Sequence, residues 1–159
     1  MRPAIVCLTL LVSLSACETS TDPFPGFGDD GSITATQAAG NWSFTVQRTS
    51  TLGCTSGSLA NGQTLTAQLT VLSDGTVTTG SSWQNPPSTQ PRPVTGTVTL
   101  SSGFADLFLA ASPGSSAAME MRGTMNSAGG FVGTLTDPAP GSFQVFGACS
   151  YTASGSKTG

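Results

Sequence analysis

From Gly40 onward, apolar and polar residues alternate along the chain, and this period of two limits the fold more than any other feature of the sequence. Side chains of a β-strand point alternately to its two faces, so the pattern predicts antiparallel strands with one buried face. The alternation is clearest at Trp42, Phe44 and Val46, and no stretch after Ala39 has a helical period. We therefore predict an all-β domain.

Eight alternating segments follow one another, separated by residues typical of turns. The turn Ser73-Asp74-Gly75 favours a hairpin, whereas the stretch 85–93 is too rich in proline to pair within a sheet. Sequential strands with short connections predict an antiparallel meander, and eight strands suffice to close an up-and-down barrel. A two-sheet β-sandwich is the alternative architecture. The predicted strands cover residues 40–46, 65–71, 77–83, 94–100, 104–111, 119–125, 131–135 and 143–151.

One short helical turn is expected at residues 34–39, directly before Gly40-Asn41-Trp42. This tripeptide and the number of strands resemble the Gly-x-Trp opening of the lipocalins and the wider calycin family. In that family the tryptophan of the first strand plugs one end of a barrel. The resemblance therefore implies that Trp42 closes one end. Residues 154–159, with Lys157 among them, are expected to form a tail beyond the last strand.

Residues 1–16 have the layout of a secretory signal, with Arg2 followed by an apolar run and then by Ser15 and Ala16. The apolar run of about eleven residues is shorter than the roughly 20 that a membrane-spanning helix needs, so we expect the segment to be removed. The sequence Leu14-Ser15-Ala16-Cys17 resembles the lipobox of bacterial lipoproteins. That resemblance implies cleavage before Cys17 and acylation of Cys17 by fatty acids such as palmitate.

Several acyl chains on one residue would make a stable membrane anchor, with membrane lipid as the partner of Cys17. Glu18 follows the cysteine where aspartate would signal retention at the inner membrane, so the resemblance favours the outer membrane, facing the periplasm or the cell surface. Residues 17–33 are rich in proline, glycine and acidic residues and have no period, which indicates a flexible tether. The predicted organisation is thus a signal peptide (1–16), a lipidated tether (17–33) and one barrel domain (34–159).

Charged residues make up 8% of the chain, against about 25% in a typical soluble domain. No basic stripe is available to contact phosphates, so nucleic acid is excluded as a partner. Once Arg2 leaves with the signal, the cations facing eight acidic residues are Arg48, Arg92, Arg122 and Lys157.

Cys54 and Cys149 are the cysteines that remain after Cys7 leaves with the signal and Cys17 receives lipid. In a compartment that oxidises thiols, this pair predicts a disulfide. A metal site is disfavoured, because the chain has no histidine and two distant cysteines fall short of four ligands. The pair Asp29-Asp30 lacks the alternating spacing of a calcium loop. We predict neither a metal nor a cofactor.

The chain is not expected to be an enzyme. Without histidine, neither a Ser-His-Asp nor a Cys-His arrangement can form. Asp106 and Glu120 fall in adjacent predicted strands and could act as a paired acid and base. We expect them instead to face solvent, with Arg122 close enough for a surface ion pair.

Two non-enzymatic functions remain. The first is the binding of a small apolar molecule inside the barrel, where Gly96, Gly133 and Gly147 reduce bulk and three methionines add an adaptable wall. The second is a structural or protein-interaction module of the envelope, favoured by the segment 104–111, which is apolar on both faces. The ligand would enter from the end with the proline-rich loop. Its predicted contacts are Trp42, Phe44, Leu69, Trp83, Leu107, Met121 and Phe143.

Overall fold

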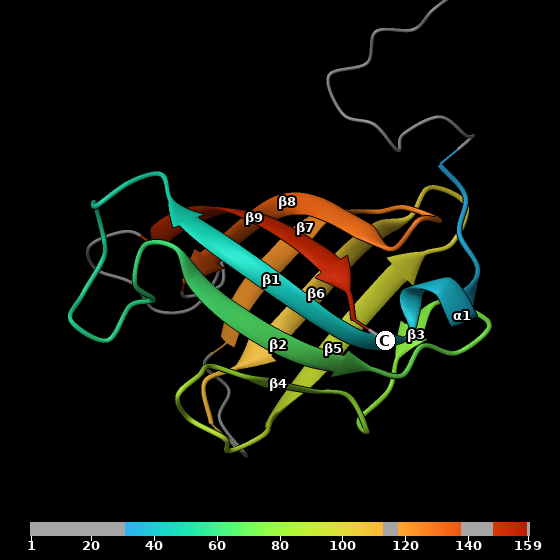
Figure 1. The fold of residues 1–159 in the computed structure, drawn as a ribbon, viewed down its shortest axis with the longest axis horizontal. Helices are drawn as coiled ribbons and strands as arrows, with labels where there is room; N and C mark the ends of the chain where they lie inside the picture. Colours follow the sequence, from blue (N-terminus) through green and yellow to red (C-terminus); the bar gives the residue numbers. More distant parts are fainter. Residues whose placement is uncertain (1–30, 113–117, 138–147, 159) are drawn as a thin grey trace, which may run out of the picture.

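The computed structural model describes residues 31–112, 118–137 and 148–158, and in these the chain is almost entirely β-structure (Figure 1). The predictions for Cys17, Phe143 and Gly147 lie outside the described residues. The elements in chain order are α1 (Ala35–Ala38), β1 (Gly40–Arg48), β2 (Gln63–Leu69), β3 (Thr76–Val77), β4 (Ser82–Gln84), β5 (Arg92–Thr99), β6 (Phe104–Ala110), β7 (Ala118–Met125), β8 (Gly130–Asp137) and β9 (Cys149–Lys157).

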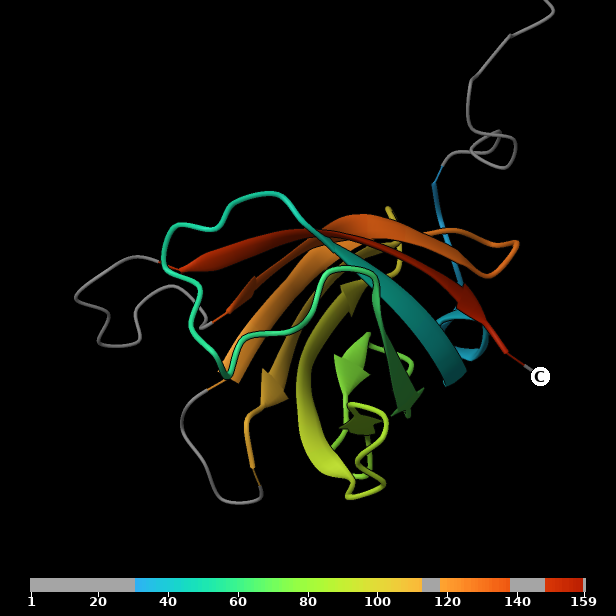
Figure 2. The same ribbon diagram turned by 60° about the vertical axis from the view of Figure 1, so that its left-hand side comes forward.

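Eight of these strands form a closed antiparallel barrel, and β3 is a short additional strand beside β5. Each barrel strand pairs with the next one along the chain, and the last strand, β9, pairs with β1 to close the ring. Figure 2 shows the long strands β6 to β9 and β1 as one curved wall, with β3 and β4 as short green arrows. The predicted meander and its closure into a barrel are confirmed, and the sandwich alternative is wrong.

The predicted third strand, 77–83, is interrupted. Thr76 pairs with Thr97 of β5, whereas Ser82 pairs with Pro93, so six residues on one side face four on the other. The two extra residues bulge between β3 and β4. Buried Ser81 holds this bulge, because its Oγ accepts from the Thr70 amide at 2.9 Å. A bulge disturbs the ladder locally while the strand continues in the same direction.

Two further strand boundaries differ from the prediction. Arg92 and Pro93 belong to β5, although the stretch 85–93 was expected to stay outside the sheet. β9 continues through Lys157, so residues 154–157 are strand and not tail. On the inward face of this stretch stand Gly155 and Lys157, neither of which is a large apolar residue, so the apolar signal of the alternation fades before the strand ends. The domain also begins slightly earlier than predicted, since Ile33 is buried and donates to the Leu100 carbonyl at 2.8 Å.

The turn at Ser73-Asp74-Gly75 is confirmed, with the Gly75 amide donating to the Leu72 carbonyl at 2.9 Å. The predicted helical turn is also present as α1, which a capping box between Thr34 and Gln37 begins. We call the end of the barrel at α1 the helix end. The opposite end, where Cys54 and Cys149 lie, is called the disulfide end.

Candidate functional site

Six of the seven residues predicted to contact a ligand lie in the described part of the chain, and all six point into the barrel. Each is exposed by 2% or less, and they come from five different strands. The prediction that these side chains converge on one interior is therefore right, while their contact with a ligand stays a prediction. The six residues are Trp42, Phe44, Leu69, Trp83, Leu107 and Met121.

The inward-facing glycines do not leave empty space. A Cβ atom at Gly133 would lie 2.8 Å from the ring of Phe131, and one at Gly123 would lie 2.6 Å from the same ring. At Gly155 the ring of Phe44 occupies the corresponding place. The two rings also contact each other edge to face, with centroids 5.2 Å apart. These glycines thus make room for aromatic rings. Of the glycines predicted to reduce bulk, Gly133 is filled by the Phe131 ring, and Gly96 faces the backbone of Asp106 in β6.

The helix end is closed by α1, whose last carbonyl groups receive hydrogen bonds from two barrel strands. Trp42 Nε1 donates to the Ala38 carbonyl at 2.8 Å, in a buried bond. Lys157 Nζ donates to the carbonyls of Thr36 at 2.9 Å and Gln37 at 3.3 Å. Trp42 and Lys157 are also direct partners in the ladder between β1 and β9. A cation at a helix C-terminus stabilises it, so these two side chains together fix the short helix over the barrel.

The contribution of Lys157 was missed because residues 154–159 were expected to be a tail. The alternation Cys149, Tyr151, Ala153 and Gly155 was the available signal, and it places Lys157 on the inward face of the same strand.

The disulfide end is closed by aromatic side chains and one covalent bond. Trp83 Nε1 donates to the Ala110 carbonyl at 2.9 Å, and the Arg92 guanidinium lies over the indole at 4.9 Å. Cys54 and Cys149 are at bonding distance, with Cα atoms 4.5 Å apart, which confirms the predicted pairing. The proline-rich loop is at this end, as expected, and Trp83 fills the place where a cavity mouth was predicted.

The loop between β1 and β2 folds back under the disulfide end. The hydroxyl of Tyr151 donates to the Leu59 carbonyl at 3.0 Å, and Leu59 is itself buried. Arg48 Nη2 donates to the same carbonyl, and the Arg48 guanidinium lies 5.9 Å from the centroid of the Tyr151 ring. The loop is therefore held by polar contacts as well as by the disulfide.

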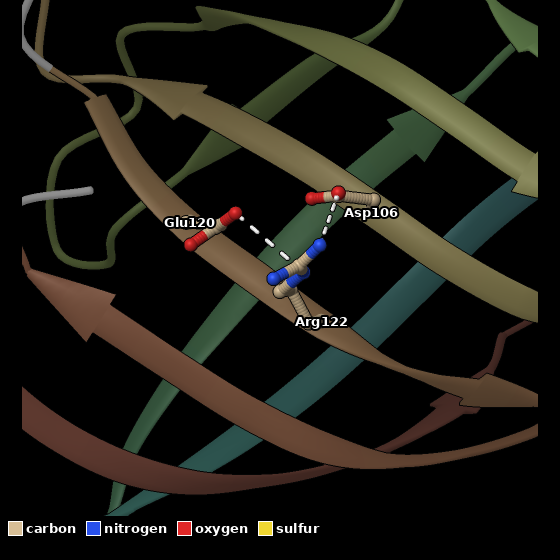
Figure 3. A network of polar contacts seen from close by, with 3 residues as sticks. All are labelled: Asp106, Glu120 and Arg122. Carbon is tan, nitrogen blue, oxygen red and sulfur yellow. Dashed lines mark hydrogen bonds and ion pairs between the residues drawn. The ribbon is translucent and has the colours of Figure 1, made fainter. Parts of the chain in front are cut away.

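A charged network lies on the outer face of β6 and β7 (Figure 3). Arg122 Nη2 is 3.1 Å from Asp106 Oδ2, and Arg122 Nε is 3.6 Å from Glu120 Oε1. Figure 3 shows the guanidinium between the two carboxylates. The expected proximity of Arg122 to both acids is confirmed. One arginine thus contacts both carboxylates.

Glu120 departs from the expectation that it faces solvent, because it is only 9% exposed. It nevertheless lies on the outer face of the barrel, where its neighbour across the ladder is Phe108.

The strand β6 is apolar on both faces, as the sequence indicates. Ala105, Leu107 and Leu109 are buried inside the barrel. Phe104 and Phe108 point outward and are 39% and 38% exposed, respectively. The Arg122 guanidinium lies 5.9 Å from the ring centroid of Phe104, so part of that ring is covered by the charged network.

Within residues 31–112, 118–137 and 148–158, no helix is long and apolar enough to cross a membrane. The same residues contain no group of three or more potential metal ligands.

Comparison with known proteins adds no name to this fold: no family profile matches the chain, and no curated protein or solved structure is significantly similar to it. Its function must therefore be argued from its own residues.

Proposed function

We propose that this chain is a lipid-anchored protein of a bacterial cell envelope whose barrel is a filled scaffold that contacts a partner protein. Leu14-Ser15-Ala16-Cys17 supports the anchor, and Glu18 supports an outer-membrane destination. The observation that carries the choice of a scaffold is that the rings of Phe44 and Phe131 occupy the space at the inward glycines. A barrel of eight strands is just wide enough for its own side chains to fill. Such a barrel would act through its surface.

The outer face of β6 and β7 is the surface that best fits a partner protein. Phe108 exposes an aromatic ring there, directly opposite Glu120 in the ladder. Asp106 and Arg122 hold fixed charges beside it, and Asp106 Oδ1 is buried without a hydrogen-bond partner. Aromatic rings and arginine are enriched at the centres of protein interfaces.

The anchor is tested by intact-mass analysis of the membrane fraction. We expect a chain that begins at Cys17 and carries acyl chains, and we expect Cys17→Ser to abolish both the cleavage and the mass increments. A processed chain that begins at another residue would contradict the anchor.

The contact surface is tested by placing a photo-crosslinking phenylalanine analogue at position 108 in intact cells. The matched control is position 47, because Gln47 is exposed on β1, across the barrel from β6. We expect a discrete adduct from position 108 and none from position 47. Equal labelling from both positions would mean that this face has no specific partner.

The binding of an apolar ligand is the second candidate, favoured by one observation. Met119, Met121 and Met125 are buried side by side on the inner face of β7, where flexible thioethers can adapt to an irregular guest. A titration of the protein with fatty acids, followed by tryptophan emission, tests it. A saturable shift would favour a carrier, whereas an unchanged spectrum with every chain length would leave the scaffold.

A further inference from the structure

Three of the large apolar side chains that remain exposed lie toward the helix end of the barrel. Leu72 is 48% exposed, Phe104 is 39% exposed and Val132 is 45% exposed. Leu72 stands in the turn between β2 and β3, while Phe104 is the first residue of β6. Phe104 and Val132 both pair with Thr124, one on each side, so they share one row across three strands. We call these three residues the helix-end rim.

The turn that carries Leu72 is fixed beside the end of β5. The Val98 amide donates to the Gly75 carbonyl at 2.8 Å, next to the end of β5. A Cβ atom at Gly75 would lie 3.7 Å from the side chain of Leu100. The three rim residues therefore lie along an arc at one end of the barrel, from the turn at Leu72 beside β5 to β6 and β8.

The chain from Cys17 joins the barrel in the middle of this arc. Ile33 bonds to Leu100, and a Cβ atom at Gly31 would lie 3.6 Å from the Ser102 carbonyl oxygen. In Figure 1 the blue segment before α1 runs along the same end of the barrel. Gly31 follows Cys17 by fourteen positions. The tether predicted from the sequence would, at that length, have a mean end-to-end distance of roughly 20 Å, so an anchor at Cys17 would hold this end near the membrane.

The charges at the helix end favour a zwitterionic bilayer over an anionic one. Asp74 lies two residues from Leu72, and hydrogen bonds from Thr76 lower the pKa of its carboxyl group, so it is anionic at neutral pH. Two described cations lie near the rim, and both are already engaged. The ammonium group of Lys157 donates to two carbonyls of α1, and Arg122, beside the Phe104 ring, is paired with the carboxylates of Asp106 and Glu120. An anionic bilayer would therefore be repelled, whereas a zwitterionic headgroup layer would not.

We propose that the helix-end rim rests on the headgroup layer of a zwitterionic phospholipid bilayer, with the disulfide end directed away from it. This inference rests on the lipid anchor at Cys17. The network of Asp106, Glu120 and Arg122 borders the rim, because the Arg122 guanidinium lies 5.9 Å from the ring centroid of Phe104. Phe108, four positions further along β6, stays on the side of the barrel where a partner protein can reach it. Leu52, which is 77% exposed in the loop at the disulfide end, points to the aqueous side in this arrangement.

The experiment uses the full lipidated chain in phosphatidylcholine vesicles whose acyl chains carry bromine, which quenches tryptophan emission at short range. Leu72→Trp and Leu52→Trp are a matched pair, because both replace an exposed leucine in a connection at one end of the barrel. The emission of Trp42 and Trp83 is common to both variants and is subtracted with the unsubstituted protein. We expect the tryptophan introduced at position 72 to be quenched at least twofold more than the one at position 52.

The outcomes separate the rim from the anchor. If both variants float with the vesicles but quenching is equal, or is stronger at position 52, the proposed contact of the rim with the bilayer is wrong. The anchor would remain supported. A chain that does not float would overturn the anchor first. Val132→Trp provides a second reporter, and near-ultraviolet circular dichroism checks that each variant keeps its packing. The protein could instead form dimers in detergent that are lost in the double variant Leu72→Ser, Phe104→Ser. The rim would then be an interface between two copies of the chain, and the proposal would be wrong.

Discussion

The two ends of the barrel are closed by similar tryptophans but are locked by different bonds. At each end one indole N–H donates to a backbone carbonyl, from Trp42 to Ala38 and from Trp83 to Ala110. The disulfide end adds a covalent link between Cys54 and Cys149, whereas the described contacts of the helix end are hydrogen bonds and the burial of Ala38. A crosslink stabilises mainly by restricting the unfolded chain, while hydrogen bonds are lost as soon as the segment opens locally. The comparison teaches that the helix end should open before the disulfide end.

The largest effect should come from removing the covalent lock. The disulfide joins residues 95 positions apart, and closing a loop of that size contributes about 4–5 kcal/mol in the chain-entropy model. We expect the double variant Cys54→Ala, Cys149→Ala to lose free energy of unfolding of this order in urea titrations. The reduced natural protein should lose a similar amount, and adding reductant to the variant should change nothing. A loss of free energy of unfolding below about 1 kcal/mol would show that the disulfide gives its end no more stability than the hydrogen bonds give the helix end.

Next in size are the matched tryptophan substitutions, which test the shared part of the closure. Trp42→Phe and Trp83→Phe each remove an indole N–H and leave a carbonyl without that donor, at a cost of about 1–3 kcal/mol. The bond of Trp42 is buried and that of Trp83 is partly buried, so Trp42→Phe should cost more. Urea unfolding measures the difference. Amide exchange should also become faster at Ala39 in Trp42→Phe alone, and acceleration there in Trp83→Phe would contradict the separation of the two ends.

A smaller effect is expected from the cation at each end. Lys157→Met keeps the aliphatic stem and removes the ammonium group from the carbonyls of Thr36 and Gln37, which should cost about 0.5–1.5 kcal/mol. Arg92→Met removes the cation from the Trp83 indole and should cost about 0.5–1 kcal/mol. Thermal unfolding of the two variants side by side ranks them. A larger loss of stability in Arg92→Met than in Lys157→Met would contradict the view that polar contacts matter more at the helix end.

The smallest effect concerns pH, and it has opposite signs at the two ends. At the disulfide end, burial raises the pKa of Asp137 above its ordinary value of 3.8. The folded state then binds more protons than the unfolded state between these two values, so stability falls as pH rises through this window. At the helix end, hydrogen bonds from Thr76 lower the pKa of Asp74, so its stabilising contribution is present above 3.8 and is lost as pH falls through the lowered value.

Urea titrations from pH 2 to 7 test both signs. Asp137→Asn should reduce the decrease in the free energy of unfolding that occurs as the pH rises above 3.8. Asp74→Asn should reduce the loss of that free energy as the pH falls below 3.8. If the slope of the free energy of unfolding against pH changed in the same direction in both variants, the two carboxyl groups would not have opposite effects on stability.

The regular strands of the barrel could be predicted from the sequence because their alternation is carried by large side chains. The prediction for 104–111 differs from β6 by one residue, and the predicted 119–125 differs from β7 by one as well. Such segments need no tertiary information, since each apolar residue at a spacing of two points to the same face. The pairing of Cys54 with Cys149 followed equally directly from the count of available cysteines.

The parts that failed are those in which small residues or neighbouring strands decide the structure. The bulge at Ser81 depends on a hydrogen bond to Thr70, the residue after β2, and no local sequence pattern predicts that bond. The glycines inside the barrel were interpreted as missing volume, although the rings of Phe44 and Phe131 reach over them from neighbouring positions. The role of Lys157 depends on its pairing with Trp42, far away in the sequence.

The seam between β1 and β9 has a consequence for how the molecule is made. Trp42 pairs with Lys157 and Arg48 pairs with Tyr151, so the first strand finds its second neighbour only in the final residues of the domain. A growing chain can assemble β1 to β8 as successive hairpins, but it exposes two unpaired edges until β9 arrives. Its vulnerable period is therefore the interval before Cys149–Lys157 has been synthesised. A chaperone that shields strand edges would matter most at that stage, and a truncation before Cys149 should yield an aggregating protein and not merely a shorter barrel.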